Sequence, residues 1–454
     1  MTPNARLIAL NILNSLGPTS GTLDQVLDAA FSGVPDMPQR DKNLVFSIVY
    51  GVLRQQRRLD WMLSHFLKTG AGNLDTPVRN ILRIGLFQIM FLSRIPDSAA
   101  VNTSVELTKI IKKLWATRFV NGVLRNAVRR YAAISLPDLK TDPESAIAIE
   151  QSMPDWLVRR WIARLGISQT MRICNAVNDI PPITLRANTL KTTRDDLLRI
   201  MTSHVREADV TSLSPEGLRL HHPETAVSAL PGFSEGLFQV QDEAAQLVTM
   251  LLNPQPGETV LDACAGMGGK TGHIAQQMHN QGRVMALDIR QDKLKKIRAE
   301  MIRLGISIVE TGCHDLTQSS SSGSSGISLY DRVLLDAPCS GLGVLRRNPD
   351  IKWRSSLERI HRCAAEQLRL LDQVSRYVKP GGCIVYAVCS MEPEENESVI
   401  ESFLQHHSEY RVDDDAGGMS CGITLPMDSC GYLRTFPHLH DMDGFFAVRL
   451  KKND

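Results

Sequence analysis

Apolar side chains recur every three or four positions through the first part of the chain, which is the spacing of amphipathic helices. One such run contains Leu44, Ile48 and Val52, and Pro77 suits the first turn of a further helix. Strand-like alternation is scarce in this region. The pattern therefore predicts an all-α bundle over residues 3 to about 132, which is an ordinary domain size.

The pattern changes between residues 182 and 240. Ile183–Ala187 reads as a strand, and Thr193–Thr202 has helical spacing. Further short strands are expected around Leu218 and at Leu237–Val240. These elements predict a small α/β module.

From Asp242 onward, strand and helix patterns alternate, which implies a mostly parallel sheet with helices on both faces. The strands are expected at Thr259–Cys264, Val284–Ile289, Ile306–Glu310, Arg332–Asp336 and Cys383–Val388. Near the end, a turn at Asp443-Gly444 predicts a last strand, Phe445–Leu450, antiparallel at one side of the sheet.

These changes of pattern define three expected domains, separated by a linker-like stretch, Ser135–Pro143. The domains are a helical one at 1–135, a linker plus the small α/β module at 136–240, and an α/β domain at 241–454. The serine-rich segment Ser319–Gly326 lies between two expected strands, and its composition predicts a flexible surface insertion.

Composition narrows the class of protein. The 454 residues are 43% hydrophobic and 22% charged, which is typical of soluble globular proteins. No apolar run approaches the ~18 residues of a membrane helix, and the N-terminus lacks a signal-peptide pattern. We therefore expect a cytoplasmic protein that is not associated with membranes.

The charge is unevenly distributed. The net charge is +2, but residues 1–130 contain 17 Lys and Arg against 8 Asp and Glu, a local net charge of +9. A basic domain favours a polyanionic partner, although a solvated helical surface rich in Lys and Arg explains the charge equally well.

The cysteines argue against a disulfide framework. There are 9, an odd number, none in the first 173 residues, and no Cys-x-x-Cys pair occurs. A structural zinc site is also disfavoured, and we expect no metal. Reduced thiols remain available for chemistry.

A glycine-rich turn follows the first strand of the α/β domain. Val260–Cys264 runs into Ala265, Gly266, Met267, Gly268, Gly269 and Lys270, and Asp288 closes the next strand. Such a turn lets a ligand approach the backbone, while the acid suits ribose hydroxyls; a tight turn with Asp288 capping a helix is the plainer alternative. The glycine spacing departs from that of dinucleotide binders, which favours S-adenosylmethionine over NAD.

Two cysteines fall at neighbouring strand ends. Cys339 follows the strand ending at Asp336, and Cys389 directly follows the next strand. Ligands of open α/β sheets bind at these carboxyl ends, so both thiols are expected at the cofactor pocket. A lone buried Cys is usually an inert small hydrophobic residue, but two at adjacent strand ends are seldom accidental.

A thiol has a specific use in methylation of cytosine. Addition of a thiolate to carbon 6 makes carbon 5 nucleophilic toward a sulfonium methyl group, and this covalent route divides one hard step into easier ones. A base must then remove the carbon 5 proton before the thiolate leaves. Asp336 is placed to stabilise the adduct near N3, and a helix beginning near Pro393-Glu394 would lower the pKa of Cys389. The residues alone do not rank the two thiols.

Several segments resemble the RsmB (Sun, Fmu) family, bacterial 16S rRNA cytosine-5 methyltransferases of the NOL/NOP/Sun group. The matching segments are Leu261–Thr271, Leu335–Gly341, Arg347–Trp353, Val385–Ser390, Glu394–Asn396, Arg434–His438 and Asp443–Phe446. Arg40-Asp41, Asn102–Val105 and Phe119–Arg125 resemble the NusB fold, an RNA-binding helical bundle, and Leu185–Lys191 is similar to the family's middle region. The resemblance thus covers nearly the whole chain and implies a Rossmann-like class I methyltransferase sheet behind a NusB-like bundle.

The resemblance also implies roles for residues. Residues 264–270, which are Cys264, Ala265, Gly266, Met267, Gly268, Gly269 and Lys270, would wrap S-adenosylmethionine. Asp288 would hold its ribose, and Asp336 would lie near both the methionine part and the target base. Cys389 would attack carbon 6, and Cys339 would assist release. The implied partner is 16S rRNA, with a target of the cytosine 967 type, and the protein is expected to be a monomer.

The chain departs from the family pattern at three places. Met267 replaces the usual Pro, and Val388 replaces the usual Thr before the nucleophile. After the third strand, alignment puts the adenine contact at Cys313, with the acid displaced to Asp315. None of these changes removes an essential thiol.

Two alternatives stay open. The same chemistry could act on tRNA or another RNA, and DNA is a more distant third substrate. A non-catalytic RNA-binding or assembly factor is the alternative of another class, although retention of both thiols, Asp336, Asp288 and the glycines argues against it. An unpaired base is easiest to reach in single-stranded RNA.

Overall fold

The computed structural model describes residues 4–17, 21–68, 74–221, 223, 225–316, 328–413 and 424–454. The serine-rich insertion expected at Ser319–Gly326 lies outside these described residues. The chain divides into two compact units, one made of Met1–Asp179 with Leu345–Arg354 and the other of Ile180–Val344 with Ser355–Asp454.

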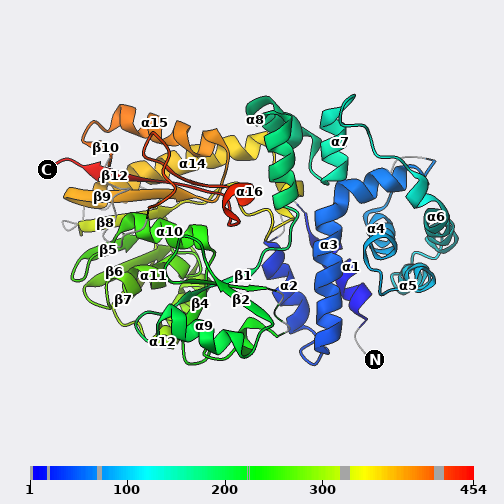
Figure 1. Ribbon diagram of the computed structural model, residues 1–454, viewed down its shortest axis with the longest axis horizontal. Helices are drawn as coiled ribbons and strands as arrows, with labels where there is room; N and C mark the ends of the chain where they lie inside the picture. The colour runs from blue at the N-terminus through cyan, green and yellow to red at the C-terminus, as the bar shows by residue number, and fades with distance from the viewer. Residues whose placement is uncertain are drawn as a thin grey trace. The chain divides into compact units, whose positions relative to one another are not determined.

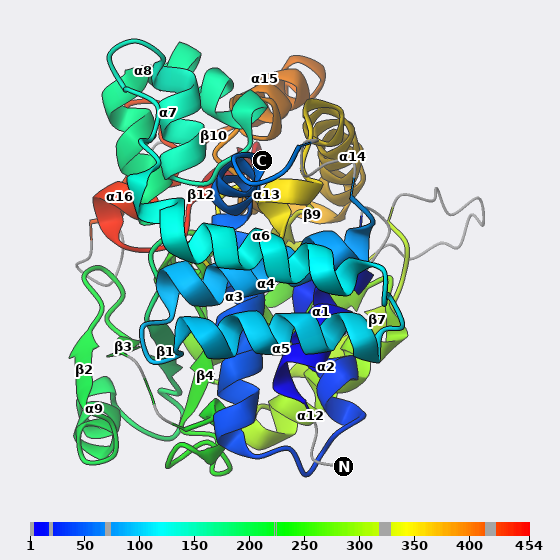
Figure 2. The same ribbon diagram turned by 90° about the vertical axis from the view of Figure 1, so that its right-hand side faces the viewer.

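The first unit is helical, as its apolar spacing predicts. Its helices are α1 (Ala5–Ser15), α2 (Leu23–Ser32), α3 (Gln39–Ser64), α4 (Thr76–Phe91), α5 (Asp97–Ile110), α6 (Ala116–Arg130), η2 (Tyr131–Ala133), α7 (Pro143–Glu150), α8 (Asp155–Ala176) and α13 (Ile351–Arg354). Pro77 lies in the first turn of α4, as expected. Helix α4 is buried on nearly all sides because it packs against α1, α3, α5 and α6 (Figure 2).

One segment of this unit comes from far along the sequence. Leu345–Arg354 lies within the range expected for the α/β domain but clusters with the helices. The indole of Trp353 donates to the carbonyl of Leu53 at 2.8 Å, and Lys352 is almost wholly buried. The expected domain boundaries after residues 135 and 240 stay predictions.

The second unit begins with a four-stranded antiparallel sheet in the order β2-β3-β1-β4. Its elements are β1 (Ile183–Ala187), α9 (Arg194–Thr202), β2 (Glu207–Val210), β3 (Gly217–His221), η3 (Val227–Ala229) and β4 (Phe238–Val240). The small α/β module is confirmed, and β2 is an addition to the predicted elements.

The main sheet of this unit has eight strands, ordered β10-β12-β9-β8-β5-β6-β7, with β11 paired to β12. The strands are β5 (Thr259–Asp262), β6 (Arg283–Asp288), β7 (Val309–Cys313), β8 (Tyr330–Asp336), β9 (Val378–Val388), β10 (Tyr410–Val412), β11 (Leu433–Thr435) and β12 (Phe445–Lys452). Strands β5 to β9 are parallel to one another, and β12 runs antiparallel to β9, as predicted. The third strand begins at Val309 rather than at Ile306.

Helices cover both faces of this sheet (Figure 1). They are α10 (Glu243–Leu252), α11 (Gly269–Gln277), α12 (Gln291–Leu304), α14 (Leu357–Val374), η4 (Ser375–Tyr377), η5 (Pro393–Glu395), α15 (Glu397–His406) and α16 (Pro437–His440). Alternate residues of β9 belong to opposite cores: Val385 packs with α10 to α12, whereas Tyr386 packs with α14 and α15. Burial on both faces explains why the central strands read as continuous apolar runs.

Candidate functional site

The two thiols predicted to share a site lie in contact. Strands β8 and β9 are parallel neighbours, so their carboxyl ends meet at one end of the sheet. Cys339 is the third residue after β8, and Cys389 directly follows β9. Their Sγ atoms are 3.0 Å apart, and both side chains are half-buried. The predicted juxtaposition is therefore present.

The surroundings of the pair raise the pKa of one of the two thiols. Contact with Cys389, burial and the nearby Glu395 carboxylate raise the pKa of Cys339 well above its usual range. Two thiolates at this distance would repel, so the pair carries at most one negative charge. With its raised pKa, Cys339 keeps its proton and can donate its S–H to the Sγ of Cys389.

The turn between β5 and α11 depends on its glycines. Gly266 has φ of 59° and Gly268 has φ of 82°, in the left-handed region that side chains other than glycine rarely adopt. Gly268 is the N-cap of α11, so the turn presents the free N–H groups of the helix N-terminus. This arrangement suits a bound ligand that accepts hydrogen bonds from the backbone.

Asp288 ends β6 and closes the other side of this turn. One carboxylate oxygen accepts from the N–H of Gly266 at 3.0 Å and pairs with Lys293 at 3.2 Å. The other oxygen accepts from the N–H of Arg290 at 2.8 Å. Asp288 therefore lies directly beside the glycine turn.

Asp336, at the end of β8, is linked to the same turn. Its carboxylate forms a 2.6 Å ion pair with Lys270 in the first turn of α11. The Lys270 ammonium also lies 5.1 Å from the ring centre of Phe445, at the start of β12. The end of β8 and the start of β12 thus meet α11 around one charge pair.

The other expected cofactor residues surround this region. Met267 is 55% exposed at the tip of the turn. Burial raises the pKa of Cys264, which argues against a thiolate there. Cys313 ends β7, pairs in register with Asp288 and is exposed; its Sγ lies 3.4 Å from the carbonyl oxygen of Ile289. Asp315 is half-buried two residues later.

Two residues of the site were missed at the level of sequence. Asp262, at the end of β5, is buried, and burial raises its pKa to about 7. One of its oxygens accepts from Thr271 at 2.6 Å, and the other has no hydrogen-bond partner among the described residues. Its place at a strand end before the glycine turn was the available signal. An unpartnered buried oxygen beside the turn fits a ligand with hydrogen-bond donors.

Arg186 of β1 is the second missed residue. It is 1% exposed, and its guanidinium donates to the carbonyl of Gly269 at 2.9 Å and to the side chain of Gln239 at 2.8 Å. It also donates to the side chains of Gln241 and Gln276. The small sheet thereby supports the first turn of α11, a long-range contact that no local pattern encodes.

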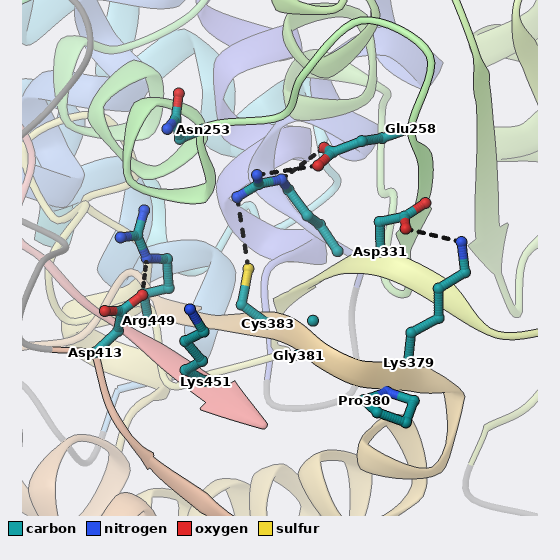
Figure 3. A pocket seen from close by; sticks show the side chains of 12 residues that line it. Asn253, Glu258, Asp331, Lys379, Pro380, Gly381, Cys383, Asp413, Arg449 and Lys451 are labelled. Carbon is teal, nitrogen blue, oxygen red and sulfur yellow. Dashed lines mark hydrogen bonds and ion pairs between the residues drawn. The ribbon is translucent and has the colours of Figure 1, made fainter. Parts of the chain in front are cut away.

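A polar cavity of about 340 Å³ lies at the opposite, amino ends of the strands (Figure 3). Six of its charged side chains form three ion pairs: Arg332 with Glu258 at 2.6 Å, Lys379 with Asp331 at 2.8 Å, and Arg449 with Asp413 at 2.8 Å. We therefore interpret these ion pairs as structural, and the cavity is not part of the thiol site.

Comparisons with known proteins identify the families that the chain resembles. Residues 249–451 match the family described as 16S rRNA methyltransferase RsmB/F, residues 3–129 the NusB family, and residues 153–228 the RsmF/B-like ferredoxin-like domain. The probable ribosomal RNA small subunit methyltransferase B of Synechocystis is 37% identical over 99% of both chains. The probable protein of the same name from Bacillus subtilis is 34% identical over 99% of both chains. The crystal structure of PH0851 aligns over 100% of this chain and 99% of its own, with a TM-score of 0.80 and 26% identity.

Fold and site together define an S-adenosylmethionine-dependent methyltransferase with a NusB-like helical domain. The chain belongs to the ribosomal RNA small subunit methyltransferase B family. Within the described residues, no helix is long and apolar enough to cross a membrane.

Proposed function

We propose that this protein transfers a methyl group from S-adenosylmethionine to carbon 5 of one cytosine in 16S rRNA, through a thiol adduct at carbon 6. The observation that carries the proposal is the 3.0 Å contact between Cys339 and Cys389, at neighbouring strand ends beside the glycine turn. The names of the relatives, which specify ribosomal RNA of the small subunit, support the choice of substrate.

The residues around the turn have the chemistry that S-adenosylmethionine requires. The N–H groups of residues 264–270 and the carboxylates of Asp262 and Asp288 would hold its polar parts, with Cys313 or Asp315 near the adenine. When bound, S-adenosylmethionine supplies an electrophilic methyl group to carbon 5. Lys270 neutralises Asp336 until substrate arrives, and both side chains border the space for the methionine part and the base.

Cys389 forms the bond to carbon 6, and its thiolate is the leaving group when that bond breaks. Cys339, the protonated member of the pair, stabilises the departing thiolate by donating its S–H. A base, which a water molecule can provide, takes the proton from carbon 5, and the electron pair of that C–H bond restores the carbon 5–carbon 6 double bond as the bond to sulfur breaks. Cys389 therefore acts twice, as nucleophile and as leaving group, whereas Cys339 acts at release.

RNA is the proposed partner of the helical unit. Residues 1–130 carry a net charge of +9, and α6 presents Arg125, Arg129 and Arg130 to solvent. Positive charge at these positions favours phosphate contacts of low sequence specificity. The target nucleotide would then be selected at the catalytic unit.

The test incubates the purified protein with unmodified 16S rRNA and S-adenosylmethionine, followed by bisulfite sequencing. We expect one new 5-methylcytosine with the wild type and none with Cys389→Ala. Cys339→Ala should instead accumulate a covalent protein–RNA complex that resists denaturation in detergent. Covalent complex with Cys389→Ala but not with Cys339→Ala would reverse the roles of the two thiols.

The same assay decides between the remaining candidates. Methylation of tRNA but not of 16S rRNA would move the substrate to tRNA. Tight binding of cofactor and RNA without transfer to any RNA would favour a non-catalytic assembly factor.

A further inference from the structure

A buried carboxylate, Glu395, lies between the two segments that carry the thiols. Its side chain is fully buried at the end of η5. One oxygen accepts from the N–H of Ser340 at 2.7 Å. The other accepts from the hydroxyls of Ser340 and Ser390, each at 2.5 Å. Since Ser340 follows Cys339 and Ser390 follows Cys389, a single carboxylate contacts the residue after each thiol.

The carboxylate is itself held in place from two further elements. Gln367 of α14 donates to Glu395 at 3.1 Å and to the carbonyl of Pro338, one residue before Cys339, at 2.9 Å. The hydroxyl of Tyr386, on β9, donates to the backbone carbonyl of Glu395 at 2.6 Å. The position of Glu395 is thus determined by α14 and β9 rather than by the two thiol segments alone.

A contribution to folding stability does not explain why a carboxylate occupies this position. Burying a charged group costs free energy that its hydrogen bonds must offset, and an apolar group of similar volume is often neutral or stabilising instead. Within the described ranges, no Lys, Arg or His side chain forms an ion pair with Glu395, so its charge is met only by the four donors. Three of those donors belong to Ser340 and Ser390, in the segments that carry the thiols. The fourth, Gln367, also donates to the segment that carries Cys339.

We propose that Glu395 is a positioning residue that aligns the thiols of Cys339 and Cys389 through hydrogen bonds to Ser340 and Ser390. This proposal rests on the proposed function, because the thiol separation matters only if one thiol attacks and the other assists release. Small displacements of a reacting group carry a large penalty: a shift of about 1 Å can cost about a hundredfold in rate.

The test needs a measure of thiol geometry that does not depend on methylation. Diamide accepts two electrons and two protons from a pair of thiols that lie in contact, leaving a disulfide between them. The rate of formation of the Cys339–Cys389 disulfide, followed by mass spectrometry of peptides, therefore reports their alignment. Glu395→Ala, the isosteric Glu395→Gln and the control Glu401→Gln, at an exposed position of α15, are compared with the wild type.

We expect Glu395→Ala to slow both disulfide formation and methyl transfer by roughly 10- to 100-fold, with the Kd for S-adenosylmethionine unchanged within about twofold. The rates of Glu395→Gln should lie between those of Glu395→Ala and the wild type. Its amide keeps one acceptor oxygen, but its NH₂ group replaces the other oxygen and faces groups that are themselves donors. Glu401→Gln should match the wild type. Wild-type disulfide and methylation rates in Glu395→Ala would overturn the proposal.

If Glu395→Ala fails to fold, as loss of cofactor binding would reveal, Glu395→Gln decides, and unchanged rates in that variant refute the positioning role. The outcomes also separate the two proposals. If the wild type methylates no RNA but Glu395→Ala forms the disulfide more slowly than the wild type does, the proposed function is refuted and the positioning role of Glu395 stands. Normal methylation with unchanged disulfide rates would refute only the role of Glu395.

Discussion

Lys352 provides a prediction that tests how the helical unit incorporates a distant segment. The side chain is 1% exposed, and its ammonium donates to the side chain of Asn178 at 2.5 Å. Burial lowers the pKa of Lys352 from 10.5 to about 7. The folded protein therefore binds this proton more weakly than the unfolded chain does.

The sign and size of the effect follow from proton linkage. Between pH 7 and 10.5 the unfolded chain keeps a proton on Lys352 that the folded protein gives up, so the free energy of unfolding rises with pH, by about 1.4 kcal/mol per unit where the difference is complete. Since Lys352 is only half deprotonated at pH 7, we expect a gain of about 1.5 kcal/mol between pH 7 and pH 8.5. Burial raises the pKa of the neighbouring Cys174 to about 12, which lowers stability only as pH approaches the ordinary thiol range near 9.

Urea unfolding at pH 7, 7.5, 8 and 8.5 measures this gain, using the wild type, Lys352→Met and the exposed control Lys140→Met. The difference in unfolding free energy between wild type and Lys352→Met should move in favour of the wild type by about 1.5 kcal/mol across this range, because other titrating groups cancel in the comparison. Lys140→Met should run parallel to the wild type. Parallel curves for wild type and Lys352→Met would refute the inference that Lys352 is buried with a lowered pKa.

Two further predictions concern the cofactor turn. Asp288→Asn should weaken binding of S-adenosylmethionine by roughly tenfold or more, since a hydrogen bond to a charged group contributes about 1.5–3 kcal/mol; calorimetric titration measures it, and an unchanged Kd would contradict the assignment. Gly268→Ala should lower stability by about 1–2 kcal/mol because φ is 82°, and its Cβ would also lie 3.1 Å from Ile297. Thermal unfolding checks this against Gly33→Ala, where φ is −75°, and equal midpoints for the two variants would count against it.

The architecture was predictable wherever burial imposes a period on the sequence. The strands before Asp336 and Cys389 are buried on both faces, so they appear as uninterrupted apolar runs with clear ends. Strands β2, β10 and β11 were missed because each has only three or four residues and a charged residue inside that short run. The third strand was placed too early because Ile306, although buried, packs in the connection after α12.

The candidate site was predictable in part for a related reason. Parallel strands bring their carboxyl ends together, so Cys339, Cys389 and Asp288 could be assigned to one region from their positions alone. The packing of Leu345–Arg354 with the helical unit could not be predicted, because its partners are hundreds of residues away in the sequence and the segment itself has no distinctive period. Arg186 was missed on the same grounds.

Glu395 marks the limit of sequence reasoning at this site. Pro393-Glu-Glu-Asn396 contains two adjacent carboxylates, and nothing in the local pattern distinguishes the half-buried Glu394 from the fully buried Glu395. Only the packing of η5 against α14 and the end of β9 makes Glu395 the buried member, with Ser340 and Ser390 as its donors. The thiols could be named from the sequence because strand ends are a property of the fold class. Their alignment could not, because it depends on a hydrogen-bond network assembled from four separate segments of the chain.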